Sequence, residues 1–448
     1  MAISSRPRYY IISMKYATIT ITRAAYRAAA VILAALIIAG WGCGGQRSER
    51  PNENQRVLSD TLRWTSGAVT ATLSPDGMLR VSGAGAMAEF TITTVEPPPS
   101  PPTPPPWRNY ESLITDLVIE EGVTHITEYA FAWLGELGSV TIPGSVAVIG
   151  YNAFAGCPSL TSIMVAVDNA HYSSKDGALF SKSQDTLILF PRSRQGAYMI
   201  PSTVTNIVDR IFNDAVGPTM ITIPASVVSI GLANIFIGCT ALTSINVEDG
   251  NPVYSSVDGV LFNKTKDTLI IYPIAKRGTY IIPDGVTTIG RSAFFGCTGL
   301  TSVTIPSSVT EIVRSAFRYC INLTSVMIPN SITEIGYDAF FGCKSLMSVT
   351  IPLSVTRIAE STFWRCTKLT SVTIPERMIS IGDMAFDRCS TLISVTSLNP
   401  VPPDIGREAF GDLPSAACLY VPARSINAYR TRWTAFNCVK AIAETGDL

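Results

Sequence analysis

Cysteine is the residue type in this 448-residue chain whose spacing could support metal or redox chemistry. Five of the ten cysteines recur every 23 residues, and two more stand at positions 157 and 239. Metal sites built from thiolates usually contain CxxC pairs or nearby histidines. The chain has no CxxC, and its two histidines are His125 and His171. The fixed period therefore indicates a repeat whose cysteines fill the core, without a metal or other cofactor. The five regularly spaced cysteines are Cys297, Cys320, Cys343, Cys366 and Cys389.

Other catalytic and nucleic-acid-binding signatures are missing from the sequence. It contains no GxSxG, HExxH or GxxxxGK[ST] motif, so no nucleophile, zinc or phosphate chemistry is predicted. Lys plus Arg and Asp plus Glu both number 34, which gives none of the basic excess of a nucleic-acid binder. Hydrophobic residues make up 47%, enough to form a large core. We therefore expect a folded, non-enzymatic protein.

A phenylalanine repeats with the cysteine and defines the unit that must hold both. One unit reads LTSVMIPNSITEIGYDAFFGC, from Leu323 to Cys343. Its alternating start predicts a short strand, Pro329 ends that strand, and Gly336 turns the chain into a brief helical segment. Such a unit cannot bury its own apolar side, so neighbouring units must stack. The phenylalanine series predicts a solenoid of about ten 23-residue coils with parallel strands. Its members are Phe131, Phe154, Phe212, Phe236, Phe294, Phe317, Phe340, Phe363, Phe386 and Phe410.

Two insertions of similar sequence interrupt the array. Residues 171–191 match residues 253–273, and both contain an Asp-Gly turn signal between strand-like runs. We expect each to form a hairpin-bearing coil inside the solenoid.

The amino-terminal segment has the features of an export signal. Residues 1–42 contain basic residues and then the apolar run AAAVILAALIIAGWG, which is short for a membrane-spanning helix. The small residue before Cys43 resembles a bacterial lipobox, although Gly40 and Trp41 depart from its pattern. This resemblance implies cleavage before Cys43 and a lipid on its thiol, anchoring the protein to a membrane. A plain cleaved signal and an uncleaved anchor are the alternatives. Residues 43–58 are interpreted as a tether.

The repeat pattern LTSVTIP-xSVTxI-GxxAFxxC resembles the BspA-like leucine-rich repeats of bacterial surface proteins. LSPDGMLRVSGAGAM (73–87) is similar to that family's amino-terminal strand pair, and LYVPARSINAYRTRWTAF (419–436) is similar to its closing segment. We accordingly predict an amino-terminal β segment (59–96), a Pro-rich linker (97–106), a leucine-rich-repeat solenoid (107–410) and a carboxy-terminal capping segment (411–448). Tyr429 and Trp433 would seal the last coil.

The resemblance also implies a function and a location. It implies an outer-membrane lipoprotein exposed at the cell surface that binds protein, as in adhesion to host matrix or cell contact. The alternative is an envelope scaffold or glycan-binding lipoprotein that faces the periplasm.

Three sets of residues are candidates for particular roles. Aromatic residues beside the repeat cysteine predict a partly exposed binding ridge of Phe295, Tyr319, Phe341 and Trp364, which could instead pack between coils. Ser-x-Thr pairs such as Ser302/Thr304 predict hydroxyl rows on the strand face, suited to binding or simply to solvation. Cys418 and Cys438 flank the closing segment and could form a disulfide in an oxidising compartment.

Overall fold

The computed structural model describes residues 58–90, 104–231 and 235–442. All of them belong to one compact unit that starts at Leu58. The predicted signal segment 1–42, Cys43, the tether up to residue 57, and residues 97–103 of the Pro-rich run lie outside the described residues. Among the described residues, no helix is both long and apolar enough to cross a membrane.

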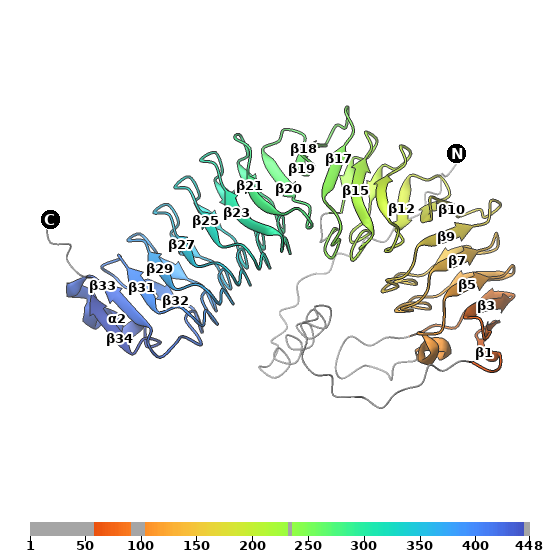
Figure 1. Ribbon diagram of the computed structural model, residues 1–448, viewed down its shortest axis with the longest axis horizontal. Helices are drawn as coiled ribbons and strands as arrows, with labels where there is room; N and C mark the ends of the chain where they lie inside the picture. Colours follow the sequence, from red (N-terminus) through yellow and green to blue (C-terminus); the bar gives the residue numbers. More distant parts are fainter. Residues whose placement is uncertain (1–57, 91–103, 232–234, 443–448) are drawn as a thin grey trace, which may run out of the picture. The chain divides into compact units, whose positions relative to one another are not determined.

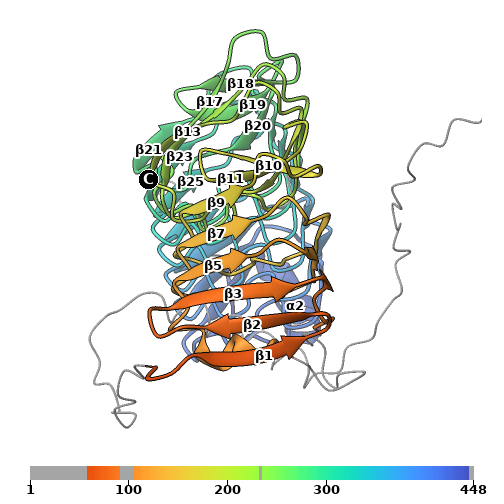
Figure 2. The ribbon, with the colours of Figure 1, turned by 90° about the vertical axis from the view of Figure 1, so that its right-hand side faces the viewer.

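The amino-terminal segment is a three-stranded antiparallel meander that begins the stack. Strands β1 (Leu62–Ser66), β2 (Val69–Leu73) and β3 (Met78–Gly83) pair in order, and the Asp-Gly turn before β3 places Gly77 at a φ of 87°. Strand β3 then pairs in parallel with β5 (Asp116–Ile119). Figure 2 shows the meander continuing the sheet of the first repeats.

Beyond the meander the chain forms a parallel β-solenoid (Figure 1). We call its main series of strands the long ladder, which is divided among three sheets. The side of the long ladder that faces solvent is called the strand face. Within the described residues the long ladder has fourteen strands: β5, β7 (Ser139–Ile142), β9 (Ser162–Val165), β13 (Gly196–Met199), β15 (Pro218–Ile223), β17 (Ser244–Val247), β21 (Gly278–Ile281), β23 (Leu300–Thr304), β25 (Ser325–Met327), β27 (Ser348–Thr350), β29 (Ser371–Ile374), β31 (Ser394–Ser397), β33 (Cys418–Val421) and β34 (Cys438–Ala441).

The solenoid fold is confirmed, but it has about 14 turns and not the ten expected from the phenylalanine series. Strands β9 and β17 lead into the insertions, and β33 and β34 end the array, so these four turns contain no member of the phenylalanine series. They join the ladder because an alternating apolar strand is sufficient for pairing.

A second series of short strands, most of them two residues long, runs along another side of the coils, and we call it the short ladder. From β8 onward each strand packs one isoleucine against the core, and β6 buries both Val123 and Ile126. It comprises β4 (Gly85–Ala86), β6 (Val123–Ile126), β8 (Val148–Ile149), β14 (Asn206–Ile207), β16 (Ser229–Ile230), β22 (Thr288–Ile289), β24 (Glu311–Ile312), β26 (Glu334–Ile335), β28 (Arg357–Ile358), β30 (Ser380–Ile381) and β32 (Asp404–Ile405).

The third side of each coil is a turn segment, and the brief helix predicted there is wrong. In one coil Ser315 and Tyr319 adopt left-handed φ values of 59° and 62°, on either side of Phe317. Their amides and that of Phe317 donate to carbonyls of the next coil over 2.7–2.8 Å. A helix would direct these donors to its own preceding turn. Because left-handed residues alternate with residues of ordinary φ, the amides point toward the neighbouring coil instead. Hydrogen bonds between coils therefore hold the third side of the stack together. The helices described are η1 (Pro106–Tyr110), η2 (Ala423–Ser425) and α2 (Ile426–Arg432).

Both insertions form the hairpins that the sequence predicts. They consist of β10 (Tyr172–Lys175), β11 (Ala178–Ser181) and β12 (Thr186–Leu189), and of β18 (Tyr254–Val257), β19 (Val260–Asn263) and β20 (Thr268–Ile271). Strands β12 and β20 return to the array by pairing with β14 and β22.

A buried asparagine fixes the start of each insertion. The Asn169 amide nitrogen donates to the carbonyls of Pro143 (2.7 Å) and Val146 (2.9 Å), and its oxygen accepts from the amides of His171 and Tyr172 (both 2.8 Å). Asn251 makes the same four bonds in the second insertion. Because the side chains are fully buried, loss of these bonds would leave polar groups unsatisfied.

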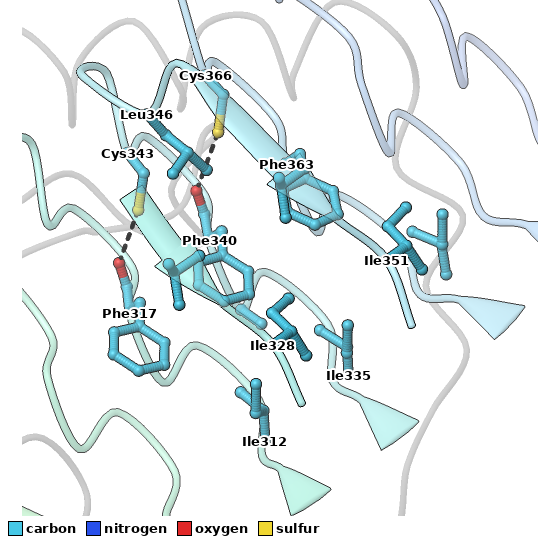
Figure 3. Close-up of a cluster of buried hydrophobic side chains, with 14 of the residues drawn as sticks. Ile312, Phe317, Ile328, Ile335, Phe340, Cys343, Leu346, Ile351, Phe363 and Cys366 are labelled. Atoms are coloured by element: carbon cyan, nitrogen blue, oxygen red, sulfur yellow. Dashed lines mark hydrogen bonds between the residues drawn. The ribbon is translucent and has the colours of Figure 1, made fainter. Parts of the chain in front are cut away.

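The core is organised around stacked phenylalanine rings (Figure 3). From Phe294 to Phe410, successive ring centroids lie 4.7–5.4 Å apart with interplanar angles of 2–11°. Trp107 stacks on Phe131 at one end of the array, and Trp433 packs on Phe410 at the other. Tyr429 contacts Trp433 and is fully buried, so both residues seal the last coil as predicted.

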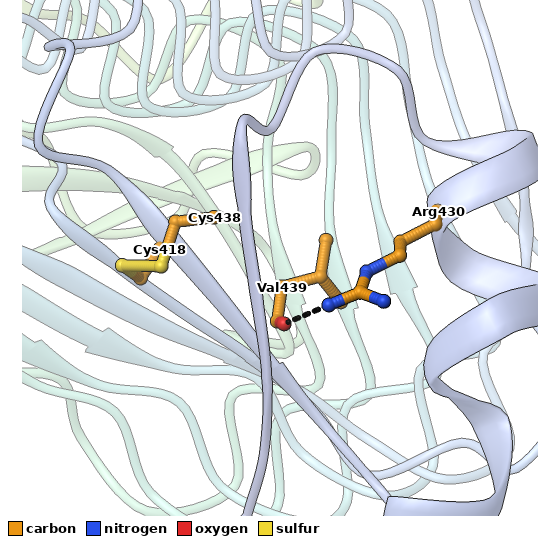
Figure 4. Close-up of a disulfide and its surroundings, with 4 residues drawn as sticks. All are labelled: Cys418, Arg430, Cys438 and Val439. Atoms are coloured by element: carbon orange, nitrogen blue, oxygen red, sulfur yellow. Dashed lines mark hydrogen bonds between the residues drawn. A yellow bond between two sulfur atoms is a disulfide. The ribbon is translucent and has the colours of Figure 1, made fainter.

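Cys418 and Cys438 form a disulfide across the last two strands (Figure 4). They are register partners in the parallel pair β33–β34, with Cα atoms 4.6 Å apart. Arg430 of α2 donates to the Val439 carbonyl of β34 at 3.4 Å, which ties the helix to the same strand.

Candidate functional site

The cysteine column lies in the core and is chemically quiet. Each thiol donates to the carbonyl of the aromatic residue one coil earlier, as Cys366 does to Phe340 at 3.3 Å (Figure 3). Burial raises the pKa of Cys157 to about 11 and those of Cys239 and Cys389 to about 12. A thiol protonated at neutral pH is a poor nucleophile and metal ligand. Across the described residues, no group of three His, Cys, Asp or Glu residues could hold a metal.

The four residues of the predicted ridge form one continuous row of rings. Phe295 contacts Tyr319 at 5.6 Å, Tyr319 contacts Phe341 at 5.2 Å, and Phe341 contacts Trp364 at 4.8 Å, each edge-to-face. The expectation that all four are partly exposed is wrong for Phe341, which is buried. The Arg318 guanidinium lies 4.0 Å from the Phe341 ring centroid and covers it. Phe295, Tyr319 and Trp364 are partly exposed.

A partly buried ion pair stands beside this row. Arg318 Nη1 lies 2.8 Å from Asp338 Oδ2, and Arg314 is 3.9 Å from the same oxygen. Burial raises the pKa of Asp338, although Arg318 and Arg314 oppose that shift. The carboxylate therefore gains less from its arginines than it loses in hydration. The ridge is therefore packed on one side against the Arg318–Asp338 ion pair of the turn segment.

The strand face presents a different surface. Within each sheet of the long ladder, the strand register pairs one residue of each strand with the equivalent residue of the next. We call these residues the outer column. They are Val118, Thr141, Met164, Met199, Thr222, Asn246, Ile281, Thr304, Met327, Thr350, Thr373, Thr396, Tyr420 and Lys440. Lys440, in the last strand, is its one charged member.

Exposed apolar side chains mark this column. Met327 is 79% exposed, Ile281 72% and Met199 63%. The residues two positions earlier are mostly serines, among them Ser302, which align in the same way along β23 to β31. A nearly uncharged face of hydroxyls and adaptable methionines can contact a partner without removing ions from water.

The sequence predicted some of the residues on the strand face but did not show how far along the solenoid that face extends. The Ser-x-Thr pairs identified the hydroxyl rows of β23, β27 and β29. Met164, Met199 and Ile281 were not recognised, because they lie in turns that lack the complete repeat pattern or have a methionine in place of threonine. Register pairing of the strands is the signal that brings them into one column.

These features define a leucine-rich-repeat solenoid, a class that typically serves as a non-enzymatic binding scaffold. The chain belongs to the BspA type leucine rich repeat family, whose model matches residues 109–195, 189–276, 272–393 and 310–429.

Solved bacterial structures share the fold. A leucine-rich repeat protein from Eubacterium ventriosum is 25% identical, with a TM-score of 0.53 over 79% of this chain and 95% of that one. A leucine rich cell surface protein from Faecalibacterium prausnitzii is 27% identical, with a TM-score of 0.50 over 75% of this chain and 94% of that one. No curated protein matches the chain.

Proposed function

We propose that the protein is a bacterial cell-surface adhesin that binds protein partners through the strand face. The observation that carries the proposal is the outer column, which crosses three sheets with one charged member and several exposed apolar side chains. Uncharged surface is inexpensive to desolvate, and exposed apolar patches commonly mark interaction sites. A similar protein described as a leucine rich cell surface protein supports the location.

The same proposal includes the mode of attachment. A lipid on Cys43 would hold the protein on the outer membrane, with the solenoid facing outward and residues 44–58 as the tether. The family resemblance supports contact with host matrix proteins or with other cells. A glycan ligand is the alternative for the same face.

The aromatic ridge is a second proposed contact, and one experiment separates it from the strand face. Purified protein is tested for binding to a panel of immobilised extracellular-matrix proteins and fixed cells, as wild type, as Thr350→Glu/Thr373→Glu and as Trp364→Ala. The double variant places charge on two exposed strand positions. We expect it to lose binding by about tenfold or more, because buried charge is costly at an interface. The ridge variant should retain binding.

Circular dichroism and urea midpoints of the variants control for folding. If Trp364→Ala alone abolishes binding, the ridge and not the strand face is the contact surface. If the wild-type protein binds nothing in the panel, the adhesin proposal fails.

A further inference from the structure

The free cysteines and the most exposed methionines of the described residues differ in their access to solvent. The seven free cysteines are buried, and burial raises the pKa values of their thiols, so peroxides meet neither exposed sulfur nor thiolate there. Four methionines are at least half exposed: Met327 (79%), Met199 (63%), Met347 (53%) and Met164 (51%). In contrast, Met378 and Met87 are 2% and 4% exposed. Methionine is therefore the sulfur that an oxidant reaches in the folded protein.

Three of the exposed methionines occupy equivalent positions. Met164 is the register partner of Thr141, Met199 of Thr222, and Met327 of both Thr304 and Thr350. Each replaces a threonine of the outer column. Met347 immediately precedes β27, one strand after Met327. The accessible thioethers thus concentrate on or beside the strand face.

We propose that Met164, Met199, Met327 and Met347 are sites of reversible oxidation by peroxides, and that their sulfoxides weaken partner binding. The thioether sulfur attacks one peroxide oxygen, the O–O bond breaks, and a sulfoxide and water form from methionine and hydrogen peroxide. Sulfur loses two electrons and the peroxide gains them. The second part of the proposal rests on the proposed function.

The chemical change explains why binding falls. A sulfoxide is a strong dipole and hydrogen-bond acceptor, whereas the thioether is apolar and adapts its shape to a partner. On a face that is otherwise almost uncharged, several sulfoxides add polar groups that a bound partner must desolvate. The core is unaffected, because its thiols and buried methionines stay covered.

The experiment treats the full chain with hydrogen peroxide and follows each methionine by peptide mass spectrometry. We expect these four residues to be oxidised well before Met87 and Met378, with no change in the circular dichroism spectrum. Oxidation of Met378 at the same rate as Met327 would overturn the assignment of selective sites.

Binding to the matrix-protein and cell panel is measured on the same samples. We expect a loss of about tenfold that methionine sulfoxide reductase restores. In a variant with leucine at all four positions, peroxide treatment should cause no further loss of binding relative to the same variant left untreated. If oxidised wild type binds normally while Thr350→Glu/Thr373→Glu does not, the inference fails and the proposed function stands. If both bind normally, the proposed function fails as well.

Discussion

The thiol of Cys343 donates a hydrogen bond to the carbonyl oxygen of Phe317, 3.2 Å away in the preceding coil. Both side chains are fully buried, and the same amide carbonyl also accepts from the amide of Cys320 at 3.1 Å. The repeated cysteine thus fills the core and satisfies part of a buried carbonyl. Its regular spacing reflects this contact between coils, and not redox or metal chemistry.

Replacement of that cysteine tests its structural role. Cys343→Ala removes buried sulfur and the hydrogen bond, and should lower the free energy of unfolding by about 1–2 kcal/mol. The exposed neighbour Lys344 offers a matched control, since Lys344→Ala changes no buried contact. Urea denaturation of both variants measures the difference. Equal stability of the two would contradict the assigned role of the thiol.

Thiol reactivity provides a second prediction. In a 58–448 fragment the seven free cysteines should not react with Ellman's reagent at pH 8, because burial excludes the reagent and raises their pKa values. All seven should react after unfolding in urea. Rapid reaction of several thiols in the folded fragment would mean that the column is accessible.

Loss of the end cap should lower the free energy of unfolding by more than loss of a single contact between coils. Trp433 is fully buried, packs on Phe410 and donates from its indole nitrogen to the Pro403 carbonyl at 3.1 Å. Trp433→Ala should lower the free energy of unfolding by about 3–5 kcal/mol. Hydrogen exchange should show protection lost first in β33 and β31, because stacked repeats depend on their neighbours. Uniform loss along the solenoid would argue against a capping role.

The left-handed glycine at position 342 gives a local test of the turn segment. A Cβ there would lie 2.8 Å from Tyr319 Cδ1, and its φ is 69°. Gly342→Ala should therefore destabilise the protein by about 1–2 kcal/mol. Gly135 has ordinary φ and open space around its Cα, so Gly135→Ala is the control and should be tolerated.

Asp338 predicts an unusual dependence of stability on pH. Burial raises its pKa in the folded state, so the native protein binds this proton more tightly than the unfolded chain. The stabilisation that this bound proton gives the folded state is complete below the ordinary pKa of 3.8. It is lost as pH rises through the higher pKa of the folded state. Asp338→Asn should flatten that decline and leave stability at pH 7 unchanged or higher.

Asp185 should have the opposite effect on the pH dependence of stability, because its pKa is lowered in the folded state. Hydrogen bonds from Ser181, Ser183 and Thr186 lower its pKa, so its contribution is present above the ordinary value and is lost as pH falls. Asp185→Asn should weaken the protein slightly at pH 7. Urea midpoints between pH 4 and pH 7 compare the two variants. A large loss for Asp338→Asn at pH 7 would show that its arginine contacts outweigh its burial.

Sequence periodicity predicted the stacked coils, because their contacts recur at a fixed spacing. The Asp-Gly turn signals predicted both hairpins, and the resemblance of residues 419–436 to a closing segment predicted the sealing role of Trp433. Periodicity did not count the turns that begin at β9, β17, β33 and β34, which contain no member of the phenylalanine series. The left-handed Tyr319 was missed because an isolated tyrosine disfavours that conformation, whereas bonds to the next coil stabilise it here. Phe341 was expected to be exposed because its cover, Arg318, comes from a neighbouring coil.

The most direct test of the strand face is site-specific photo-cross-linking. Benzoylphenylalanine is placed at Met327 or Thr350 of the outer column, or at Tyr337, which is 56% exposed on the turn segment. Each protein is irradiated with a partner from the binding panel. Covalent adducts from positions 327 and 350, with none from 337, are the result predicted here. Adducts from 337 alone would contradict the assignment of the strand face as the binding surface.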